Sequence, residues 1–477
     1  MKRLTALALA GAAALAACSD NSSTLFDPAP TLSVSGTAGA VTHVTSAADA
    51  GSGSFRAAVE AANTDPGISR IAFEKGVGPV SLATPIVFTG SQAMVIDGND
   101  VVLDGGSLGA AESIFLTTGG GDLEVRNLTV RNAPGSGIEV QVPAGSTGTL
   151  QYGLVNLTAC DNGGHGAVIN DQADPVDVAN EAGSAAGLVV RVSGSRFEGN
   201  GFGAGDRDGL RINEGGAGSL HAVITQTVVL ANGGDGIELD ERGVGDVVFD
   251  VQHTQFSFNG ELDPADLEDG LDVDESQDGS AIGRFVQVSA NDNFEEGLDL
   301  NENHAGDMRI EMSQVETSRN GEEGVDLEED DDFAGGGDLI ASLRNVTANG
   351  NTNGDAGIKI RERGDGNLNA ELVNPAGSSN ARAGISLRED AAGNLDATVV
   401  GALTAGNGSH GVIYDENSDG ELTGALRASN SSDNAGAGVR AEQATTGAGL
   451  LRIEKLTAVG NIGGAISSSG VTVDQAP

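Results

Sequence analysis

Apolar and polar residues alternate in short segments along most of the chain, and many of these segments follow a glycine. In the clearest copies an apolar residue stands at the first and third positions after the glycine, as in Leu210 and Ile212 or Ile237 and Leu239. Alternation with a period of two is typical of a β-strand, whose successive side chains point to opposite faces. Each copy therefore predicts one short strand with a buried face and an exposed face.

The glycine that begins each segment recurs at a regular interval. The commonest interval is 27 residues, as between Gly270 and Gly297, and longer intervals contain inserted loops. A fixed period with insertions is typical of a solenoid, in which each repeat contacts its neighbours. The segments between the glycines show further alternation with a period of two and no helical periodicity. We therefore expect an all-β fold, a single-stranded parallel β-helix (solenoid), with its repeats over residues 107–477.

An asparagine precedes the repeat glycine by four residues in many copies. This set consists of Asn162, Asn232, Asn293, Asn320, Asn353, Asn380, Asn407 and Asn434. Side-chain amides stacked in one column can bond to the coils above and below, because each amide carries donors and an acceptor. We predict a structural asparagine ladder that includes Asn320, Asn380 and Asn407.

Residues 41–106 lack the glycine pattern and are expected to form an N-terminal cap with the first coils. The segment from Gly53 to Asn63 places Phe55, Val59 and Ala62 on one face of an amphipathic helix. Such a helix can cover the apolar end of the first coil, which would otherwise face water.

The same segment carries a family resemblance. Residues 53–63 read Gly-Ser-Phe-Arg-Ala-Ala-Val-Glu-Ala-Ala-Asn. This resembles the Ser-Leu-Arg-Glu-Ala segment that opens many exported right-handed β-helix proteins, with Phe55 in place of Leu and Ala57 in place of Glu. The chain thus resembles the pectate-lyase-like right-handed parallel β-helix superfamily, which implies a right-handed solenoid with an N-terminal capping helix. Because that superfamily includes lyases, hydrolases, epimerases, adhesins and inert stalks, the resemblance implies no particular activity.

The first residues predict export. Lys2 and Arg3 precede an apolar stretch over residues 4–17, and Cys18 follows it. The sequence Leu-Ala-Ala-Cys at 15–18 resembles a lipobox, which implies a lipoprotein signal peptide over residues 1–17 and lipid attachment at Cys18. Residues 18–40 are rich in small polar residues and are expected to form a flexible tether. We therefore expect an exported protein that is anchored to a bacterial membrane by its lipid, with the outer membrane or cell surface favoured.

The net charge of the chain limits the classes of molecule that it can bind. The chain has 69 Asp and Glu residues against 25 Lys and Arg residues, a formal net charge of -44. This balance argues against nucleic acid as a partner, because phosphate binding needs clustered positive side chains. The acids concentrate between residues 261 and 332, so one part of the rod is expected to present a strongly acidic face.

In register, the acids fall into columns that point outward. The positions two and four residues after the repeat glycine include Asp272, Asp274, Asp299, Asp326 and Glu328. Adjacent coils bring column members to about 4.8 Å, where two like charges repel by about 1 kcal/mol even at the dielectric constant of water. Carboxylate oxygens at this spacing suit Ca²⁺, which prefers several oxygen ligands in a flexible geometry. We expect Ca²⁺ as the cofactor of this face, and the alternative is a solvated acidic face without specific sites.

A glutamate stands five residues after the glycine in eight successive copies, and Glu241, Glu275 and Glu302 belong to this set. The column persists where the neighbouring residues are basic. We therefore expect a structural ladder in which each glutamate accepts hydrogen bonds from backbone amides of the following turn, with cation bridging as the alternative.

Basic residues follow the acids in the same columns. Lys359 follows Asp326, and Arg361 and Arg388 follow Glu328. This layout allows a catalytic hypothesis in which Ca²⁺ binds a substrate carboxylate and Lys359 accepts a proton, with the arginines beside it. The alternative, which we favour, is a charge pair that stabilises neighbouring coils.

Three functions remain open at this stage. The first is a surface interaction or adhesion rod that binds a polysaccharide or a cell-surface protein. The second is a polysaccharide-active enzyme (a Ca²⁺-dependent lyase, a hydrolase or an epimerase), with a groove between the loops at 261–269 and 329–337. The third is a structural stalk or coat protein. The chain has no Trp and 2 Tyr residues, which removes the usual stacking platforms of sugar sites and argues against the enzyme.

Overall fold

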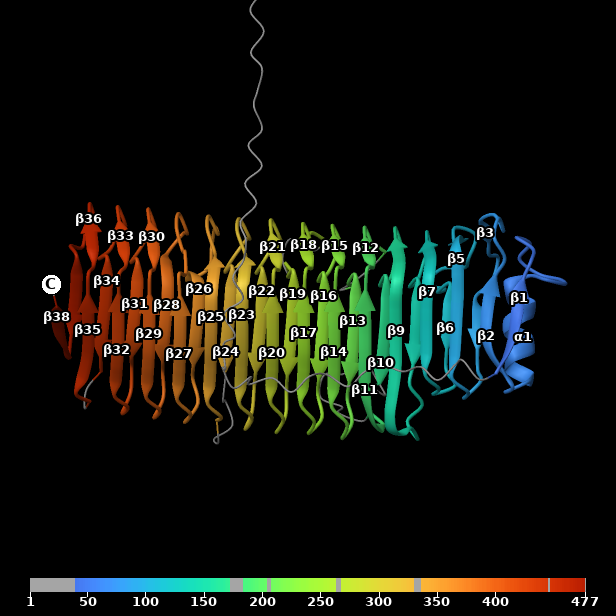
Figure 1. The fold of residues 1–477 in the computed structure, drawn as a ribbon, viewed down its shortest axis with the longest axis horizontal. Coiled ribbons are helices and arrows are strands. Elements are labelled where there is room, and N and C mark those ends of the chain that lie inside the picture. Colours follow the sequence, from blue (N-terminus) through green and yellow to red (C-terminus); the bar gives the residue numbers. More distant parts are fainter. Residues whose placement is uncertain are drawn as a thin grey trace, which may run out of the picture.

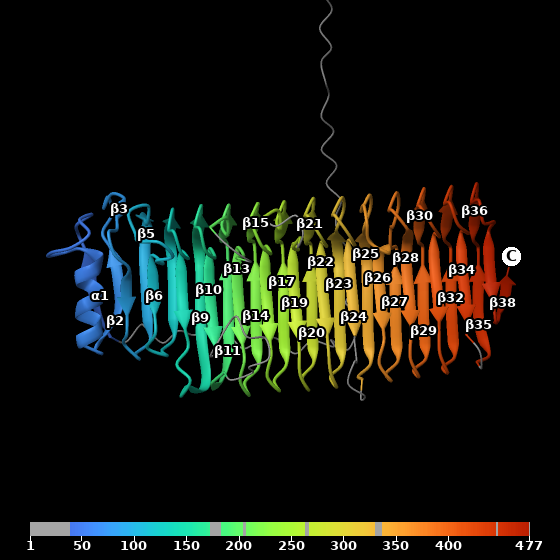
Figure 2. The same cartoon turned by 180° about the vertical axis from the view of Figure 1, so that it is seen from behind.

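The fold comes from a computed structural model that describes residues 39–171, 183–203, 207–262, 267–329, 336–444 and 447–476. The expected signal peptide, Cys18 and nearly all of the expected tether lie outside the described residues. The described part is one long stack of coils with a helix at one end and the C-terminal strands at the other, as Figures 1 and 2 show from opposite sides.

The outward columns lie on a 14-stranded sheet, here called the face sheet. Its strands are β4 (Ile86–Phe88), β6 (Phe115–Thr117), β8 (Ile138–Gln141), β10 (Ala167–Asp171), β13 (Leu210–Glu214), β16 (Ile237–Glu241), β19 (Leu271–Glu275), β22 (Leu298–Glu302), β24 (Val325–Glu329), β26 (Ala356–Glu362), β28 (Ala383–Glu389), β31 (Val412–Glu416), β34 (Val439–Gln443) and β37 (Ile466–Ser469). Each pairs in parallel with the strand one coil away, as Figure 1 shows.

The remaining strands complete each coil. A 21-stranded sheet contains β1 (Ala40–Val44), β2 (Ile68–Phe73), β3 (Val80–Ser81), β5 (Met94–Asp104), β7 (Leu123–Arg131), β9 (Thr147–Cys160), β11 (Ala185–Ser193), β12 (Arg196–Glu198), β14 (Leu220–Thr225), β15 (Val228–Leu230), β17 (Val247–Gln252), β18 (Gln255–Ser257), β20 (Ala281–Val286), β21 (Ser289–Asn291), β23 (Met308–Glu316), β25 (Leu339–Thr347), β27 (Leu368–Val373), β29 (Leu395–Val400), β32 (Leu422–Arg427), β35 (Gly449–Glu454) and β38 (Val471–Ala476). A third sheet contains β30 (Leu403–Ala405), β33 (Asn430–Ser432) and β36 (Thr457–Val459). These parallel pairings confirm the expected all-β solenoid.

The core is a column of apolar side chains that runs along the rod. Leu271 and Val273 of β19 stack in register on Leu298 and Leu300 of β22, and all four are fully buried. They stand at the first and third positions after the repeat glycine, so the alternation places them inside and the acids between them outside. This register fixes which side chains become neighbours on the face sheet.

The helix α1 (Phe55–Thr64) covers the first coil, and this confirms the expected cap. Ser54 begins the helix, because its side chain accepts a hydrogen bond from the amide of Ala57 at 3.2 Å. Phe55 is buried, and its ring centroid lies 5.1 Å from that of Phe73 and 6.2 Å from that of Phe115. The helix therefore closes the apolar column at the N-terminal end.

A ladder of asparagines runs inside the rod. The side-chain amide of Asn380 donates to Asn407 Oδ1 at 3.3 Å, and Asn320 accepts from Asn293 at 3.2 Å. The expectation for Asn353 is wrong: Asn351 occupies the ladder position in that coil, and its amide donates to Asn380 Oδ1 at 3.1 Å. The reason is an insertion between the ladder position and the glycine, which shifts the four-residue spacing.

We predict that Asn320→Ala lowers the free energy of unfolding by about 2–4 kcal/mol, because it removes buried hydrogen bonds and leaves their partners unsatisfied. The matched control is Asn353→Ala, since Asn353 is exposed and stands outside the ladder. Thermal and urea unfolding of both variants test this. Equal stability of the two variants would contradict the structural account of the ladder.

Candidate functional site

The acidic residues expected on one face do gather there. In-register pairing stacks Glu238, Asp272, Asp299 and Asp326 in one column of the face sheet. Beside it, the second column contains Asp240, Asp274, Asn301 and Glu328 in the same coils. We call these residues, together with Asp235, Asp269 and Glu296 at the position before the glycine, the acidic patch.

Positive side chains neutralise the two ends of the acidic patch. At one end, Arg211 contacts Glu238 and lies 3.1 Å from Asp240. At the other end, the Lys359 ammonium lies 2.6 Å from Asp326 Oδ2 and 2.7 Å from Glu328 Oε2. The charge of the patch is therefore balanced at its ends and concentrated in its middle coils.

The middle of the patch has no such balance. Among the described residues, no ion pair joins Asp269, Asp272 or Asp274 to a lysine or arginine within 4.0 Å. Burial and neighbouring carboxylates raise the pKa of Asp274 to about 7 and hold the pKa of Asp272 well above its ordinary value. The same two causes raise the pKa of Glu296 to about 10. These carboxyl groups resist ionisation unless a cation joins them.

Three carboxyl groups in the middle coils are placed to share one cation. Asp269, Asp272 and Asp299 each offer an oxygen, and these oxygens lie within 4.8 Å of one another. Asp272 Oδ1 is buried and has no hydrogen-bond partner. Of the predicted calcium ligands, the structure thus brings Asp272 and Asp299 together with Asp269, whereas Asp326 and Glu328 bind Lys359 instead.

The acids before the glycine also stabilise the stack itself. Asp208 Oδ1 accepts a hydrogen bond from the amide of Asp235 at 3.0 Å, and Asp235 Oδ1 accepts one from the amide of Asp269 at 2.6 Å. Asp269 Oδ1 accepts from the amide of Glu296 at 2.6 Å. Each of these side chains thus uses one oxygen to bind the next coil.

The glutamate column forms a second buried ladder. Glu241 Oε1 accepts a hydrogen bond from the amide of Gly243 at 2.7 Å, Glu275 from Gly279 at 3.3 Å and Glu302 from Gly306 at 3.2 Å. All three side chains are fully buried. Burial, followed by hydrogen bonding to the carboxyl group one coil away, raises the pKa of Glu241 to about 9 and that of Glu275 to about 10. Neighbouring carboxyl groups therefore share protons at neutral pH.

The basic residues of the catalytic hypothesis form ion pairs. Burial alone would lower the pKa of Lys359, but the carboxylates of Asp326 and Glu328 raise it above the ordinary value for lysine. Arg361 contacts Asp390, and Arg388 Nε lies 2.5 Å from Asp390 Oδ1. This geometry favours the charge-pair interpretation, because a lysine held in its charged form cannot accept a proton.

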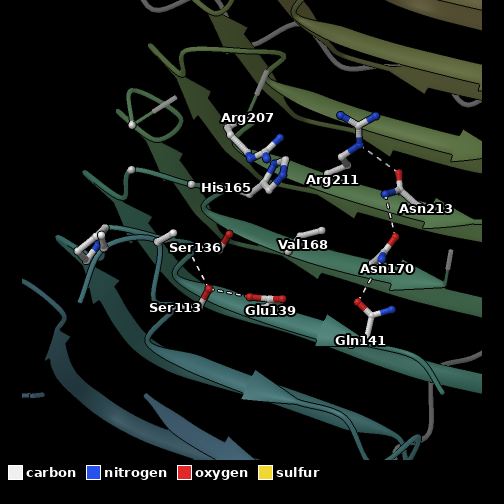
Figure 3. A pocket seen from close by; sticks show the side chains of 17 residues that line it. Ser113, Ser136, Glu139, Gln141, His165, Val168, Asn170, Arg207, Arg211 and Asn213 are labelled. Atoms are coloured by element: carbon white, nitrogen blue, oxygen red, sulfur yellow. Dashed lines mark hydrogen bonds between the residues drawn. The ribbon is translucent and has the colours of Figure 1, made fainter. Parts of the chain in front are cut away.

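A groove of about 670 Å³ lies on the face sheet, toward the N-terminal side of the acidic patch, across β8, β10 and β13. Its polar lining consists of Ser113, Ser136, Glu139, Gln141, His165, Asn170, Arg207, Arg211 and Asn213, as Figure 3 shows. This groove was not expected from the sequence, although its lining includes residues of the two columns that carry acids further along. The groove expected between the loops at 261–269 and 329–337 falls partly outside the described residues.

Hydrogen bonds order the side chains of the groove. Asn213 Nδ2 donates to Asn170 Oδ1 at 3.1 Å, and Asn170 Nδ2 donates to Gln141 Oε1 at 3.2 Å, so three amides form a row (Figure 3). Ser113 Oγ donates to Glu139 Oε2 at 2.7 Å. Val168 contributes an apolar surface between them. The groove therefore presents fixed donors and acceptors around a small apolar floor.

The strand pairing defines the class: the chain is a parallel β-helix protein. No family model and no curated relative matches it in sequence. Solved structures that resemble it include pectate lyase Pel9A, with 14% identity over 68% of this chain and 79% of that chain at a TM-score of 0.40. Another is PfbA, a surface adhesin of Streptococcus pneumoniae, with 12% identity over 87% and 90% at a TM-score of 0.38.

The periplasmic alginate epimerase AlgG is also similar, with 11% identity over 77% of this chain and 76% of that chain at a TM-score of 0.33. At these values the similarities say nothing about activity. In the described part of the chain, no helix has the length and hydropathy that a membrane span requires.

We predict that stability falls as the pH rises from about 5 to 9. The folded pKa values of Glu241 and Glu275 lie above the ordinary glutamate value, so the folded state binds more protons than the unfolded state in this range. Stability is therefore fully present below the unfolded pKa and is lost as the pH approaches the folded values. Thermal unfolding across this range at constant ionic strength measures the effect.

Glu275→Gln is the matched variant for this prediction. An amide can donate the hydrogen bond that a protonated carboxyl group donates, and Gln443 already occupies this column beside Glu416. We expect a weaker pH dependence in the variant than in the parent chain. A profile as steep as that of the parent would show that the ladder does not retain protons.

Proposed function

We propose that this chain is a non-enzymatic binding rod that recognises a neutral, hydroxyl-rich ligand such as an oligosaccharide in the groove. The supporting observation is the row of amides formed by Gln141, Asn170 and Asn213. Amides donate and accept at fixed positions, which matches the alternating donors and acceptors of sugar hydroxyl groups. A rod that presents such a groove on its side suits a surface interaction or adhesion function.

The groove chemistry favours binding over catalysis. Glycoside hydrolysis uses a pair of carboxyl groups, and Glu139 is the only carboxylate among the described lining residues. His165 Nδ1 accepts a hydrogen bond from the amide of Asp208 at 3.0 Å, so its basic lone pair is already occupied. The described lining of the groove therefore contains no pair of carboxyl groups, and His165 is held by Asp208, whose Oδ2 lies 3.3 Å from its Nδ1.

The charge of the chain favours a neutral ligand over a polyuronate. Arg211 lines the groove, but its guanidinium already contacts Asp240 and Glu238. The net charge of -44 repels acidic polymers at long range. Because the described lining of the groove contains no Phe, Tyr or Trp, we expect weak binding with a Kd on the order of 1 mM, about −4 kcal/mol.

The same proposal includes a Ca²⁺ ion in the middle of the acidic patch. Asp269, Asp272 and Asp299 would hold it, since their oxygens converge and the buried Oδ1 of Asp272 has no other partner. Hard oxygen ligands with flexible spacing favour Ca²⁺ over transition metals. Its chemistry here would be structural: it would offset the repulsion between the middle coils.

Export and lipid attachment at Cys18 complete the proposal. A lipid at the N-terminus would anchor the chain to a membrane, and the expected tether over residues 18–40 would hold the rod away from it. The groove could then reach a polysaccharide or a glycosylated cell-surface protein. Metabolic labelling with a fatty acid, compared between the parent and Cys18→Ser, tests the anchor.

We predict that Val168→Arg weakens saccharide binding at least tenfold, because a long charged side chain would fill the apolar floor of the groove. The matched control is Ile413→Arg, which alters the same outward column far along the face sheet. Calorimetric titration with neutral oligosaccharides, with polygalacturonate for comparison, measures binding. Equal affinity in both variants, or preference for polygalacturonate, would refute the proposed ligand class.

We predict that Ca²⁺ raises the thermal stability of the chain more than Mg²⁺ or Na⁺ at matched ionic strength. At a hundredfold excess over Kd, a bound ion stabilises the folded state by about 2.7 kcal/mol. Asp272→Asn should unfold at a higher temperature than the parent in chelator, because a buried amide needs neither a charge nor a bound proton among the neighbouring carboxyl groups. It should also lose the Ca²⁺-specific gain.

Asp396→Asn, an exposed acid on the opposite sheet, is the control for the calcium experiment and should retain the full gain. An equal response of the parent to all three salts would mean that the acidic patch is only screened. The saccharide experiment would still stand, because the groove does not include the calcium ligands.

A further inference from the structure

The sequence Asn-Gly occurs eight times in this chain and is a chemically reactive pair. The pairs begin at Asn162, Asn200, Asn232, Asn259, Asn320, Asn349, Asn353 and Asn407. Because glycine has no side chain, its backbone nitrogen can approach the side-chain amide of the asparagine before it. The reaction needs an asparagine side chain that can rotate and a glycine N–H that is not hydrogen-bonded, so the structure determines which pairs can react.

Six of these asparagines belong to the asparagine ladder and are held on both sides of the bond that would form. The side-chain amide of Asn320 donates to the carbonyl of Ala290 at 3.0 Å, and the amide of Gly321 donates to the carbonyl of Asn293 at 3.0 Å. The glycine amides of the other five ladder pairs donate in the same way to backbone carbonyl groups of the preceding coil, and they belong to Gly163, Gly201, Gly233, Gly260 and Gly408. Local opening of the coil must therefore precede any reaction at these pairs.

The seventh pair lies outside the ladder and is also held. Asn349 Oδ1 accepts a hydrogen bond from the amide of Ser378 at 2.8 Å, and the amide of Gly350 donates to the carbonyl of Ser378 at 2.9 Å. Both reacting groups of this pair are thus bound to the next coil.

Asn353 differs from the other seven asparagines. It is exposed in the turn between β25 and β26, in the coil whose insertion moves it away from the ladder position. Its backbone amide donates to the carbonyl of Gly321 at 2.9 Å. Among the described residues, neither the side chain of Asn353 nor the amide of Gly354 has a hydrogen-bond partner. Both reacting groups are therefore available.

We propose that Asn353 is a site of spontaneous deamidation. The backbone nitrogen of Gly354 attacks Cγ of Asn353 and forms a C–N bond, and the side-chain nitrogen leaves as ammonia with the amide proton of Gly354. Water then opens the resulting cyclic imide at either carbonyl group, which produces aspartate or isoaspartate. Water is the co-reactant, and no oxidant, metal or enzyme takes part.

The position of the turn limits the damage that the modification causes. Deamidation adds one negative charge and, in the isoaspartyl product, one carbon atom to the backbone. Asn351 donates to the ladder at 3.1 Å and precedes the modified bond, so the stack of amides stays intact. The modified fraction should therefore increase with the age of the protein while the rod remains folded.

Peptide mapping by mass spectrometry after incubation of the folded chain in mildly alkaline buffer tests the proposal. Residues 345–359 form one tryptic peptide, because trypsin cleaves after Arg344 and Lys359, and this peptide contains both Asn349 and Asn353. Fragmentation distinguishes the two positions, and a digest of fresh protein corrects for reaction during digestion. We expect Asn353 to be converted about tenfold faster than Asn349, because reaction at Asn349 requires the coil to open.

Two controls separate structural protection from intrinsic reactivity. In urea, Asn349 and Asn353 should react at similar rates, since both precede glycine in an unfolded chain. Asn353→Gln should abolish the isoaspartate that an isoaspartyl methyltransferase detects in the folded parent. Equal rates at Asn349 and Asn353 in the folded chain, an intact Asn353 in the folded chain that reacts only in urea, or an unchanged isoaspartate signal in Asn353→Gln would overturn the proposal.

Discussion

Parallel pairing of each strand with the equivalent strand one coil away is the constraint on which the rest of this structure depends. Coils in register stack equivalent repeat positions on one another, so a residue type that recurs at one position forms a continuous column along the rod. An apolar position becomes a continuous core, as Leu271 and Leu298 show. An amide position becomes a ladder, and an acidic position becomes a column of like charges about 4.8 Å apart. This geometry stabilises stacked apolar residues and amides and destabilises stacked carboxylates.

Three different interactions offset the repulsion between stacked carboxyl groups in this protein. The buried glutamates share protons and accept hydrogen bonds from turn amides, as Glu275 does. The acids before the glycine bind the amide of the next coil, and the ends of the acidic patch are neutralised by Arg211 and Lys359. Among the described residues, the centre around Asp272 lacks a basic partner and depends on raised pKa values and bonds to the next coil. The proposed cation would supply the missing positive charge.

The sequence was sufficient for features that repeat and insufficient for features that depend on one coil. The two-residue alternation after each glycine predicted the solenoid, and Phe55, Val59 and Ala62 predicted the capping helix. The spacing rule placed Asn380 correctly in the ladder but chose Asn353 over Asn351. The long interval before Gly357 indicates an insertion, but its place between ladder and glycine is apparent only once the strands are paired. The position of Lys359 one coil after Asp326 favoured a charge pair between coils, but the second ion pair, with Glu328, became apparent only in the structure.

The groove is a second feature that the repeat pattern did not predict. Its row of amides occupies the column that further along carries Asp274 and Glu328. The repeat therefore predicts where these side chains lie, but not that they form a binding groove. Its lining also includes the turns near Ser113, Pro134 and Gly163. A solenoid can thus vary its chemistry coil by coil on an unchanged framework. The proposed binding in one set of coils and charge compensation in the next need no change of fold, because each depends only on its neighbouring coils.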